Sequence, residues 1–250
     1  MARLFDDGAS DYLINSTRII TAWPFTMAGW GRTNDNSVIQ TVAGLADVDT
    51  TNKYVALWFG AVGTAAVIRA WVINAGAGGV EANTSTQYSE NIWHHLCGVY
   101  EADDIHVYLD GGGKGSLGSN GKVIPEFDNV SVGMMRDSSP DQEMSGDLAE
   151  AAVWDVALTD AEVAILAAGY SPLFVRPQSL IFYAPLIRGL NDKVGGLTLT
   201  ADGTTVSAHP RIIYPAPIWT GFPIVGGEPP AGSPGVVLLM DHFNGGFLNG

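Results

Sequence analysis

The stretch Trp93–Gly112 concentrates side chains of the types that bind metals or transfer protons. It reads WHHLCGVYEADDIHVYLDGG, with two adjacent histidines, two adjacent aspartates and an Asp-Gly-Gly run. Successive side chains of an extended strand point to opposite faces, so His94 and His95 do not form a chelating pair on a regular strand. Asp103 and Asp104 separate two strand-like runs, as the residues of a hairpin loop do. The stretch therefore indicates architecture rather than a reactive centre.

Paired carboxylates are the other arrangement that could carry a reaction. Retaining glycanases hold two carboxylates about 5 to 5.5 Å apart, one as nucleophile and one as acid. On an extended strand Glu143 and Asp147 would share a face but lie too far apart, and Glu150 would point to the opposite face. The chain also has no G-x-S-x-G nucleophile elbow, and Gly111–Ser116 lacks the spacing of a phosphate-binding loop. We therefore expect a protein that is not an enzyme.

Two acidic loops offer the oxygen ligands that calcium prefers in proteins. Asp47 and Asp49 belong to the first loop, residues 47–52, and Asp137 and Asp141 belong to the second, residues 137–143. Neither loop matches a defined calcium-binding sequence, because the residue eleven positions after Asp47 is Trp58 rather than a glutamate. These four aspartates are the candidate metal ligands. Ordinary acidic surface loops are the alternative.

Charge and cysteine content exclude several classes of function. The chain has 12 basic and 26 acidic side chains and a formal net charge of -14, which repels nucleic-acid phosphates and anionic lipids. The lone cysteine, Cys97, lies in an apolar run, where a buried and inert thiol is expected. The opening residues MARLFDDGAS lack the apolar segment of a secretory signal, and no run reaches the roughly 20 apolar residues of a membrane span. We expect synthesis in the cytoplasm without a signal peptide, no nucleic-acid binding and no membrane insertion.

The candidate residues lie among many short strand-like segments, which are rich in β-branched and aromatic residues and separated by Gly, Asn, Asp and Ser. The clearest segments are 25–30, 37–43, 54–59, 66–73, 92–100, 105–110, 129–134, 148–154 and 180–186. One short helix is indicated by the capping box Thr159–Glu162, with a stop at Gly169. Many strands with a single helix predict an all-β fold, a sandwich of two antiparallel sheets.

The composition changes after Tyr214. Prolines and a Gly-Gly pair interrupt residues 215–250, so no long regular element is expected in this C-terminal arm. The arm nevertheless contains an apolar run, VVLLM, which would be a sticky strand if left in water. The predicted docking residues are Val236, Val237, Leu238, Leu239, Met240, Phe243 and Phe247. We therefore divide the chain into a domain, residues 1–214, and an arm, residues 215–250, that docks on its own domain or on a neighbouring subunit.

Several motifs resemble those of laminin G-like domains in the concanavalin A-like lectin/glucanase superfamily. The hairpin formed by Trp93–Leu96, Val99–Tyr100 and Val107–Gly111 resembles the pattern W-x-H-hydrophobic, V-Y, hydrophobic-Y-hydrophobic-D-G. The other similar segments are the opening strand Phe5–Tyr12, the strand Phe25–Trp30, the closing strand Gly146–Trp154 and the helix start Ala157–Glu162. The resemblance covers about residues 3 to 170. It is weaker over residues 173–213, which are expected to add strands to the sandwich.

The resemblance implies a jelly-roll sandwich of two curved antiparallel sheets. It also implies that loops at one rim, or the concave face, bind glycans or proteins, often with calcium. Ala149 departs from the pattern, in which an aspartate is common, and removes one carboxylate. An aromatic platform for sugar is expected from a loop, because most tryptophans lie in strand-like runs and are expected in the core. These tryptophans are Trp30, Trp58, Trp71, Trp93 and Trp154.

Three functional hypotheses follow. The first is a non-enzymatic structural or adhesion module, a bacteriophage virion component such as a head decoration or tail-associated protein, displayed on the virion surface. Its partners would be neighbouring subunits, identical or from the capsid or tail, held through the arm. The alternative is a calcium-assisted carbohydrate-binding protein that uses rim loops near Asp47, Asp49, Asp137 and Asp141. The third is a glycanase that depends on Glu150.

Overall fold

The computed structural model describes residues 2–61, 68–73, 78–118, 126–187 and 189–215, and the fold is given for these residues. The chain divides into two units, residues 1–215 and 216–250. The strands and helices of the described residues all belong to the first unit. The predicted docking residues of the arm, from Val236 to Phe247, lie outside the described residues.

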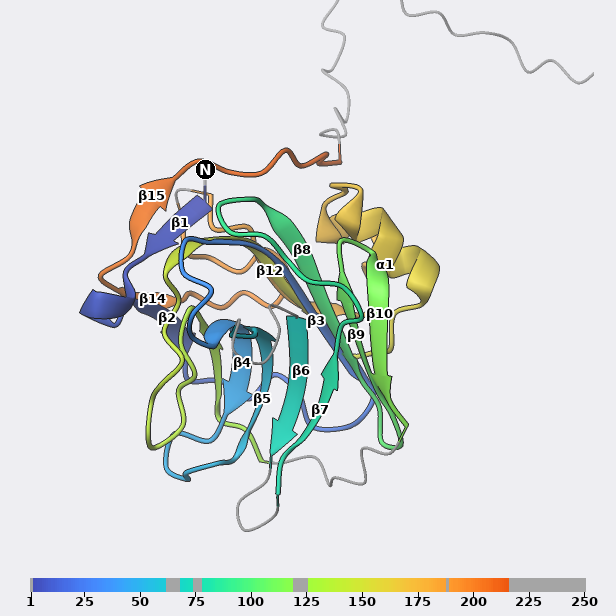
Figure 1. Ribbon diagram of the computed structural model, residues 1–250, viewed down its shortest axis with the longest axis horizontal. Helices are drawn as coiled ribbons and strands as arrows, with labels where there is room; N and C mark the ends of the chain where they lie inside the picture. Colours follow the sequence, from blue (N-terminus) through green and yellow to red (C-terminus); the bar gives the residue numbers. More distant parts are fainter. Residues whose placement is uncertain (1, 62–67, 74–77, 119–125, 188, 216–250) are drawn as a thin grey trace, which may run out of the picture. The chain divides into compact units, whose positions relative to one another are not determined.

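Two antiparallel sheets form a sandwich, as predicted (Figure 1). One sheet has eight strands, in the order β10-β9-β8-β3-β12-β1-β15, with β13 also paired to β12. Its strands are β1 (Ala2–Phe5), β3 (Phe25–Thr33), β8 (His94–Tyr100), β9 (Ile105–Leu109), β10 (Gly112–Leu117), β12 (Gly146–Trp154), β13 (Leu180–Ala184) and β15 (Thr205–Ser207). The other has seven strands, in the order β14-β2-β11-β4-β5-β6-β7. Its strands are β2 (Tyr12–Asn15), β4 (Gln40–Ala46), β5 (Tyr54–Phe59), β6 (Ile68–Ile73), β7 (Val80–Asn83), β11 (Asn129–Val132) and β14 (Thr200–Asp202).

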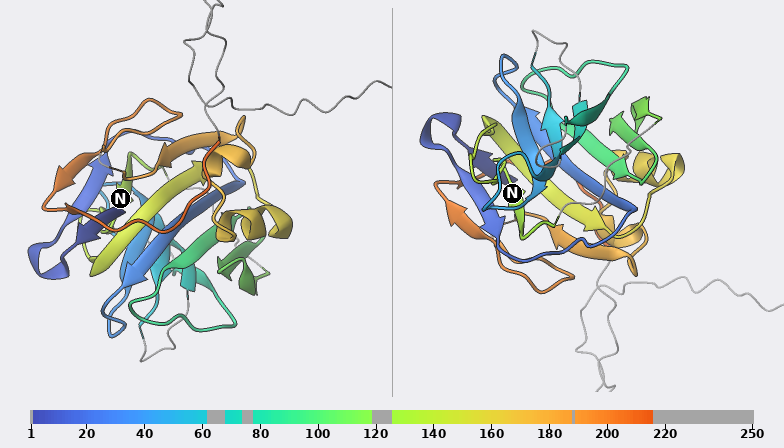
Figure 2. Two further views of the ribbon diagram at one scale, coloured as in Figure 1. Left: turned by 90° about the horizontal axis from the view of Figure 1, so that it is seen from above. Right: turned by 90° about the horizontal axis from the view of Figure 1, so that it is seen from below.

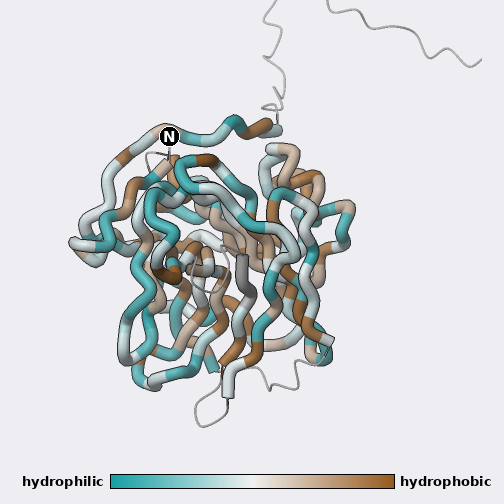
Figure 3. The backbone as a smooth tube through the Cα atoms, in the orientation of Figure 1, coloured by the Kyte–Doolittle hydropathy of each residue, from teal (hydrophilic) through white to brown (hydrophobic). Residues whose placement is uncertain are grey.

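The main hydrophobic core lies between the two sheets. Alternate side chains of β3 and β5, such as Phe25, Met27, Leu57 and Phe59, are fully buried there. Burying one such side chain contributes about 1.5 to 3 kcal/mol. Gly31 permits the packing, since a Cβ at this position would lie 2.6 Å from the Phe59 ring. Figure 3 shows hydrophobic residues along the strands and mostly hydrophilic ones in the connecting loops.

The tryptophans are placed differently from our expectation. Trp154 is fully buried, but on the outer face of the eight-stranded sheet, beneath the helix. Trp58 is 3 % exposed, yet it belongs to a separate cluster on the outer face of the seven-stranded sheet. Trp30, Trp71 and Trp93 are half-buried. Neighbouring strand residues point to opposite faces, so a strand position does not by itself place an aromatic ring in the main core.

The helix α1 (Asp160–Ala167) begins with the predicted capping box. The Thr159 hydroxyl accepts from the Glu162 backbone amide, and the Glu162 carboxylate accepts from the Thr159 amide over 2.8 Å. Val163 and Leu166 are buried against the outer face of the eight-stranded sheet. No helix within the described ranges is long and apolar enough to cross a membrane.

The histidine-containing stretch 93–112 forms a hairpin, as predicted. β8 and β9 pair around the loop 101–104, in which the Glu101 amide donates to the Asp104 carbonyl over 2.9 Å. His94 Nδ1 lies 2.7 Å from Asp110 Oδ2, whereas His95 is buried with its ring edge-on to Trp30. The two imidazole rings therefore make different contacts, although the His95 backbone amide also donates to Asp110, over 2.8 Å.

The glycine-rich segment after this hairpin is the strand β10 rather than a turn. Lys114 lies within the strand, and its Nζ is 2.9 Å from Asp160 Oδ1. Glycine carries no side chain to mark a strand in a sequence pattern, although its backbone pairs with β9 in the ordinary way.

Residues 173–213 add strands to both sheets, as expected from the sequence. β13 pairs with β12, β15 extends the eight-stranded sheet and β14 extends the seven-stranded sheet. The left view of Figure 2 shows the chain after β15 crossing the outer face of the eight-stranded sheet. This course carries His209 and Tyr214 over β12, where they contact Glu150.

Candidate functional site

Glu150 lies at a β-bulge in the middle of β12. β12 and β3 pair regularly up to Ala149 and again from Ala152, so the two residues between them face a single residue of β3. Glu150 has a φ of 57°, in the left-handed region that costs a non-glycine residue about 1 to 3 kcal/mol. Its side chain is 2 % exposed, on the face that the C-terminal segment covers. A strained and buried acid in an apolar strand requires compensating partners.

Two tyrosines and a histidine supply these partners. The Tyr183 hydroxyl donates to Glu150 Oε2 over 2.6 Å, and the Tyr214 hydroxyl donates to Oε1 over 2.6 Å. His209 Nε2 lies 3.1 Å from Oε1. A hydrogen bond to a charged group contributes about 1.5 to 3 kcal/mol, so these contacts offset the burial of the carboxylate. Three segments that are distant in the sequence therefore meet at one carboxylate.

Both tyrosine hydroxyls stay protonated at neutral pH. Burial raises the pKa of Tyr183, and the neighbouring Glu150 carboxylate raises it further. The pKa of Tyr214 is raised by burial and then by its hydrogen bond to the same carboxylate. The phenols therefore act as hydrogen-bond donors that fix the orientation of the two rings, and they are not poised as nucleophiles.

A pocket of about 430 Å³ shares both tyrosines with this cluster. We call it the tyrosine pocket, and it is lined by Leu173, Tyr183, Pro185, Ile187, Lys193 and Tyr214. Its volume lies in the range of small-molecule sites, about 300 to 1,000 Å³. Aromatic and aliphatic walls with few polar groups are the usual composition of such sites. The tyrosine pocket is therefore the candidate ligand site.

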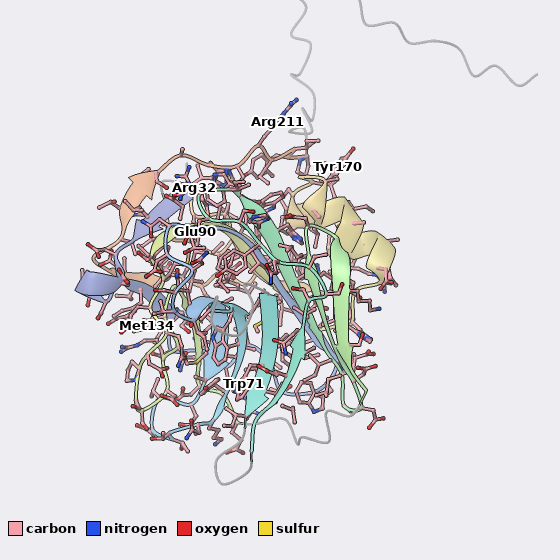
Figure 4. All side chains as sticks on the ribbon, in the orientation of Figure 1. Arg32, Trp71, Glu90, Met134, Tyr170 and Arg211 are labelled. Atoms are coloured by element: carbon pink, nitrogen blue, oxygen red, sulfur yellow. The ribbon has the colours of Figure 1, made fainter. Side chains whose placement is uncertain are left out.

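The other acids near Glu150 are engaged elsewhere. Asp147 Oδ2 lies 2.9 Å from Nε and 2.6 Å from Nη2 of Arg32 (labelled in Figure 4). Glu143 lines a different pocket, together with Asp7. No carboxylate is among the described lining residues of the tyrosine pocket. Among the described residues, no two carboxylates therefore face the tyrosine pocket together.

The sequence pointed to Glu150 but not to its partners. The available signal was a single charge inside an otherwise apolar strand, LAEAAVW, because such a charge must be satisfied. Tyr183 follows in the next strand of the same sheet, with its Cα paired to Ala152. Neither the bulge nor the return of residues 209–214 to β12 has a signature in the residue types.

Two of the four predicted metal ligands lie together. Carboxylate oxygens of Asp47, Asp49 and Asp128 lie within 4.8 Å of one another. Lys53 Nζ, however, lies 2.7 Å from Asp47 Oδ2, and this hydrogen bond holds the pKa of Asp47 below its usual range. The Val48 amide uses one oxygen of Asp128. Because a lysine already balances these acids, the group fits a bound calcium ion poorly, and calcium binding stays a prediction.

The other two predicted ligands lie in the adjoining loop. Asp137 Oδ2 accepts from the Asn52 amide over 2.7 Å, so the two predicted loops do meet. Asp137 and Asp141 do not join the three-carboxylate group in the described part of the chain. Burial and the charges of Asp137 and Glu143 raise the pKa of Asp141 to about 6. The surroundings of Asp141 therefore disfavour its ionised form.

A second aromatic surface lies on the outer face of the seven-stranded sheet. Its rings belong to Tyr54, Trp58 and Trp71, and Trp71 is labelled in Figure 4. The Trp58 and Trp71 rings stack with centroids 5.5 Å apart, and the centroids of Tyr54 and Trp58 are 5.9 Å apart. Our expectation placed an aromatic platform in a loop, whereas these rings come from two adjacent strands. Trp58 is 3 % exposed and Tyr54 is 7 % exposed, so Trp71 is the ring of the three that a ligand could contact.

Comparison with known proteins agrees with this architecture. A family model described as the concanavalin A-like lectin/glucanases superfamily matches residues 7–164. A heptameric pentraxin from Limulus polyphemus is 16 % identical, with a TM-score of 0.62 over 83 % of this chain and 94 % of the pentraxin chain. A proposed carbohydrate binding protein from Bacteroides ovatus is 19 % identical, with a TM-score of 0.61 over 85 % of this chain and 61 % of that one. None of the curated proteins matches the sequence. The family match includes Glu150 but ends before Tyr183, His209 and Tyr214.

Proposed function

The chain belongs to the concanavalin A-like lectin/glucanase superfamily, and from this membership we propose that it is a non-enzymatic glycan-binding module. We place the sugar in the tyrosine pocket. The proposal depends on one observation, which is that a buried carboxylate holds both tyrosine rings of the pocket by their hydroxyls.

A fixed aromatic wall suits a sugar ring. The C–H face of a pyranose is apolar and packs on aromatic rings, while its hydroxyls need nearby polar groups. Glu150 sets the orientation of Tyr183 and Tyr214 before a ligand arrives, so less side-chain freedom is lost on binding. The pocket is therefore preorganised, which raises affinity without new contacts.

The lack of paired acids among the described residues of the pocket supports a binding role. Hydrolysis of a glycosidic bond uses two carboxylates, about 5 to 5.5 Å apart in retaining enzymes and about 6.5 to 9.5 Å apart in inverting ones. Glu150 is committed to two hydroxyls and a histidine, and Asp147 is paired with Arg32. In addition, one structural neighbour is described as a proposed carbohydrate binding protein.

The binding test uses two exposed tyrosines. Tyr214 is 39 % exposed and lines the pocket, whereas Tyr170 is 40 % exposed and lies outside it. On a glycan array, the wild-type chain should bind a subset of glycans, Tyr214→Ala should lose this binding and Tyr170→Ala should keep it. Loss of binding in Trp71→Ala, with Tyr214→Ala unaffected, would instead place the site on the outer face of the seven-stranded sheet.

We propose further that the module works on the surface of a bacteriophage particle, as a head decoration or tail-associated protein. The acidic composition and the buried thiol of Cys97, which needs no oxidising compartment, support this location. The apolar run VVLLM in the arm, residues 215–250, would dock on a neighbouring subunit.

Removal of residues 226–250 tests this second proposal. The shortened chain should fold and bind glycan as a monomer, while the full chain should form an oligomer of a multiple of 26.4 kDa. Sedimentation or light scattering measures both masses. A full chain that stays monomeric and binds sugar would favour a carbohydrate-binding protein outside any particle, and a shortened chain that keeps the oligomer would remove the arm from the interface.

A further inference from the structure

The tyrosine pocket carries a charge opposite in sign to that of the protein. The chain has a formal net charge of -14, yet Lys193 is the only ionised residue among the pocket's described lining residues. The raised pKa values of Tyr183 and Tyr214 keep both rings neutral. A ligand in the pocket therefore meets neutral walls and one ammonium group.

Lys193 is available to a ligand. The other two described lysines, Lys53 and Lys114, are paired with aspartates at 2.7 and 2.9 Å. Among the described residues, no carboxylate forms a salt bridge with Lys193, whose side chain is exposed. The carboxylate of the adjacent Asp192 accepts from the backbone amides of Tyr183 and Val194 and forms no ion pair with this ammonium.

The position of Lys193 is set by the strand that carries the aromatic wall. Its backbone amide donates to the Tyr183 carbonyl over 2.8 Å, which fixes the base of the side chain beside the pocket. The Asp192 carboxylate holds the same turn through the Tyr183 amide at 2.8 Å. The lysine is thus part of the pocket's construction rather than a side chain on an unrelated loop.

The buried acid lies behind the wall of the pocket, whereas the lysine lines it. The Glu150 carboxylate accepts from the hydroxyls of Tyr183 and Tyr214 and is not among the described lining residues, so a ligand can contact the Lys193 ammonium directly but not this carboxylate. At physiological salt, the remaining acidic side chains are screened over about 8 Å. A negative group on a ligand would then be attracted locally by Lys193, although the whole protein repels anions at long range.

We infer that the tyrosine pocket selects an acidic sugar, with Lys193 binding its carboxylate or sulfate group. This inference rests on the proposed glycan-binding function and specifies the class of glycan. A neutral sugar has no group that requires the ammonium, whereas a uronic acid or a sulfated hexose presents an anion next to an apolar ring face. The two kinds of anion share this chemistry, and the experiment separates them.

The test uses the full-length chain and three matched oligosaccharides. One is neutral, one has a single hexose replaced by the uronic acid, and one carries a single sulfate on that hexose. Titration calorimetry should give at least about tenfold tighter binding for one acidic form than for the neutral form, since a charged hydrogen bond contributes more than about 1.4 kcal/mol. The tighter of the two acidic forms identifies the anion.

Lys193→Met should abolish the preference, so that the acidic and neutral oligosaccharides bind this variant with the same affinity. Lys193→Arg should retain most of the preference for the acidic oligosaccharide, because the positive charge remains. Arg211→Met is the matched control, since it removes one positive charge from the C-terminal segment at an exposed side chain that points away from the domain in Figure 4. The preference should also weaken as salt rises from about 50 to 500 mM, whereas neutral binding should not.

The outcomes separate this inference from the proposed function. Equal binding of neutral and acidic forms by the wild-type chain overturns the role of Lys193 and leaves glycan binding in place. A preference that survives in Lys193→Met also overturns it. Absence of binding to any of the three, and to the glycan array, overturns both proposals.

Discussion

The hydroxyl of Tyr214 lies 2.6 Å from the carboxylate of Glu150, although 64 positions separate the two residues. Glu150 belongs to the region that the family model matches, whereas Tyr214 belongs to the segment after it. The bond thus ties the segment after the family match, residues 165–215, which we call the extension, to the middle of β12. All described lining residues of the tyrosine pocket belong to this extension.

Replacing Glu150 with glutamine should destabilise the domain. The side-chain amide keeps the size of the carboxylate but has one acceptor oxygen instead of two, so one of the two tyrosine hydroxyls loses its partner. We expect a loss of about 1 to 3 kcal/mol in the free energy of unfolding, measured by urea titration. Glu126→Gln, at an exposed side chain, is the control and should change stability by less than about 0.5 kcal/mol. Equal stabilities of the two variants would show that Glu150 does not anchor the extension.

The strands of the sandwich were largely predictable from residue types. The runs 54–59 and 105–110 correspond closely to β5 and β9, because β-branched and aromatic residues are concentrated there. The helix was predictable from its capping box, which is a local hydrogen-bonding pattern. β10 was not predicted, because glycines dominate it and its pairing depends on β9 rather than on its own side chains.

The candidate site was much less predictable. Glu150 was noticed as a possible acid on a regular strand, but its environment depends on a register shift of β12 against β3. Tyr183, His209 and Tyr214 reach it from positions 33 to 64 residues away. Such contacts are set by the course of the chain over the sheet, and no spacing rule relates the residues involved.

Calcium binding by Asp47, Asp49 and Asp128 should be limited by Lys53. An ion at these carboxylates would have to displace the ammonium that lies 2.7 Å from Asp47 Oδ2. We expect weak calcium affinity for the wild-type chain and at least about tenfold higher affinity for Lys53→Met, because the competing cation is gone. Calorimetry with calcium chloride checks both values. Tight binding by the wild-type chain, with no gain in the variant, would show that Lys53 does not compete.

Asp141→Asn should stabilise the domain at neutral pH. The pKa of Asp141 is raised to about 6 in the folded chain from 3.8, so between these values the folded state binds more protons than the unfolded state. Stability contributed by this group therefore falls as the pH rises from about 4 to 6 and stays low above 6. Solvent screening at this exposed side chain reduces the effect to about 1 kcal/mol. Urea titrations at pH 4 and pH 7.5 should show a gain for the variant only at the higher pH. A gain of equal size at both values would attribute it to something other than ionisation.

His95→Phe should make the domain more resistant to acid. Burial lowers the pKa of His95 to about 4 from 6.5, and the charge of Asp110 opposes this shift only in part. The folded chain therefore keeps the imidazole neutral between pH 6.5 and 4, while the unfolded chain binds a proton there. The free energy of unfolding therefore decreases as the pH drops across this window, by about 3 kcal/mol at pH 4. Phenylalanine has no proton to bind and can keep the edge contact with Trp30, whose ring centroid lies 5.5 Å from that of His95. The slope of unfolding free energy against pH, measured from 7 to 4, should be shallower in the variant, and an unchanged slope would assign the acid sensitivity to other groups.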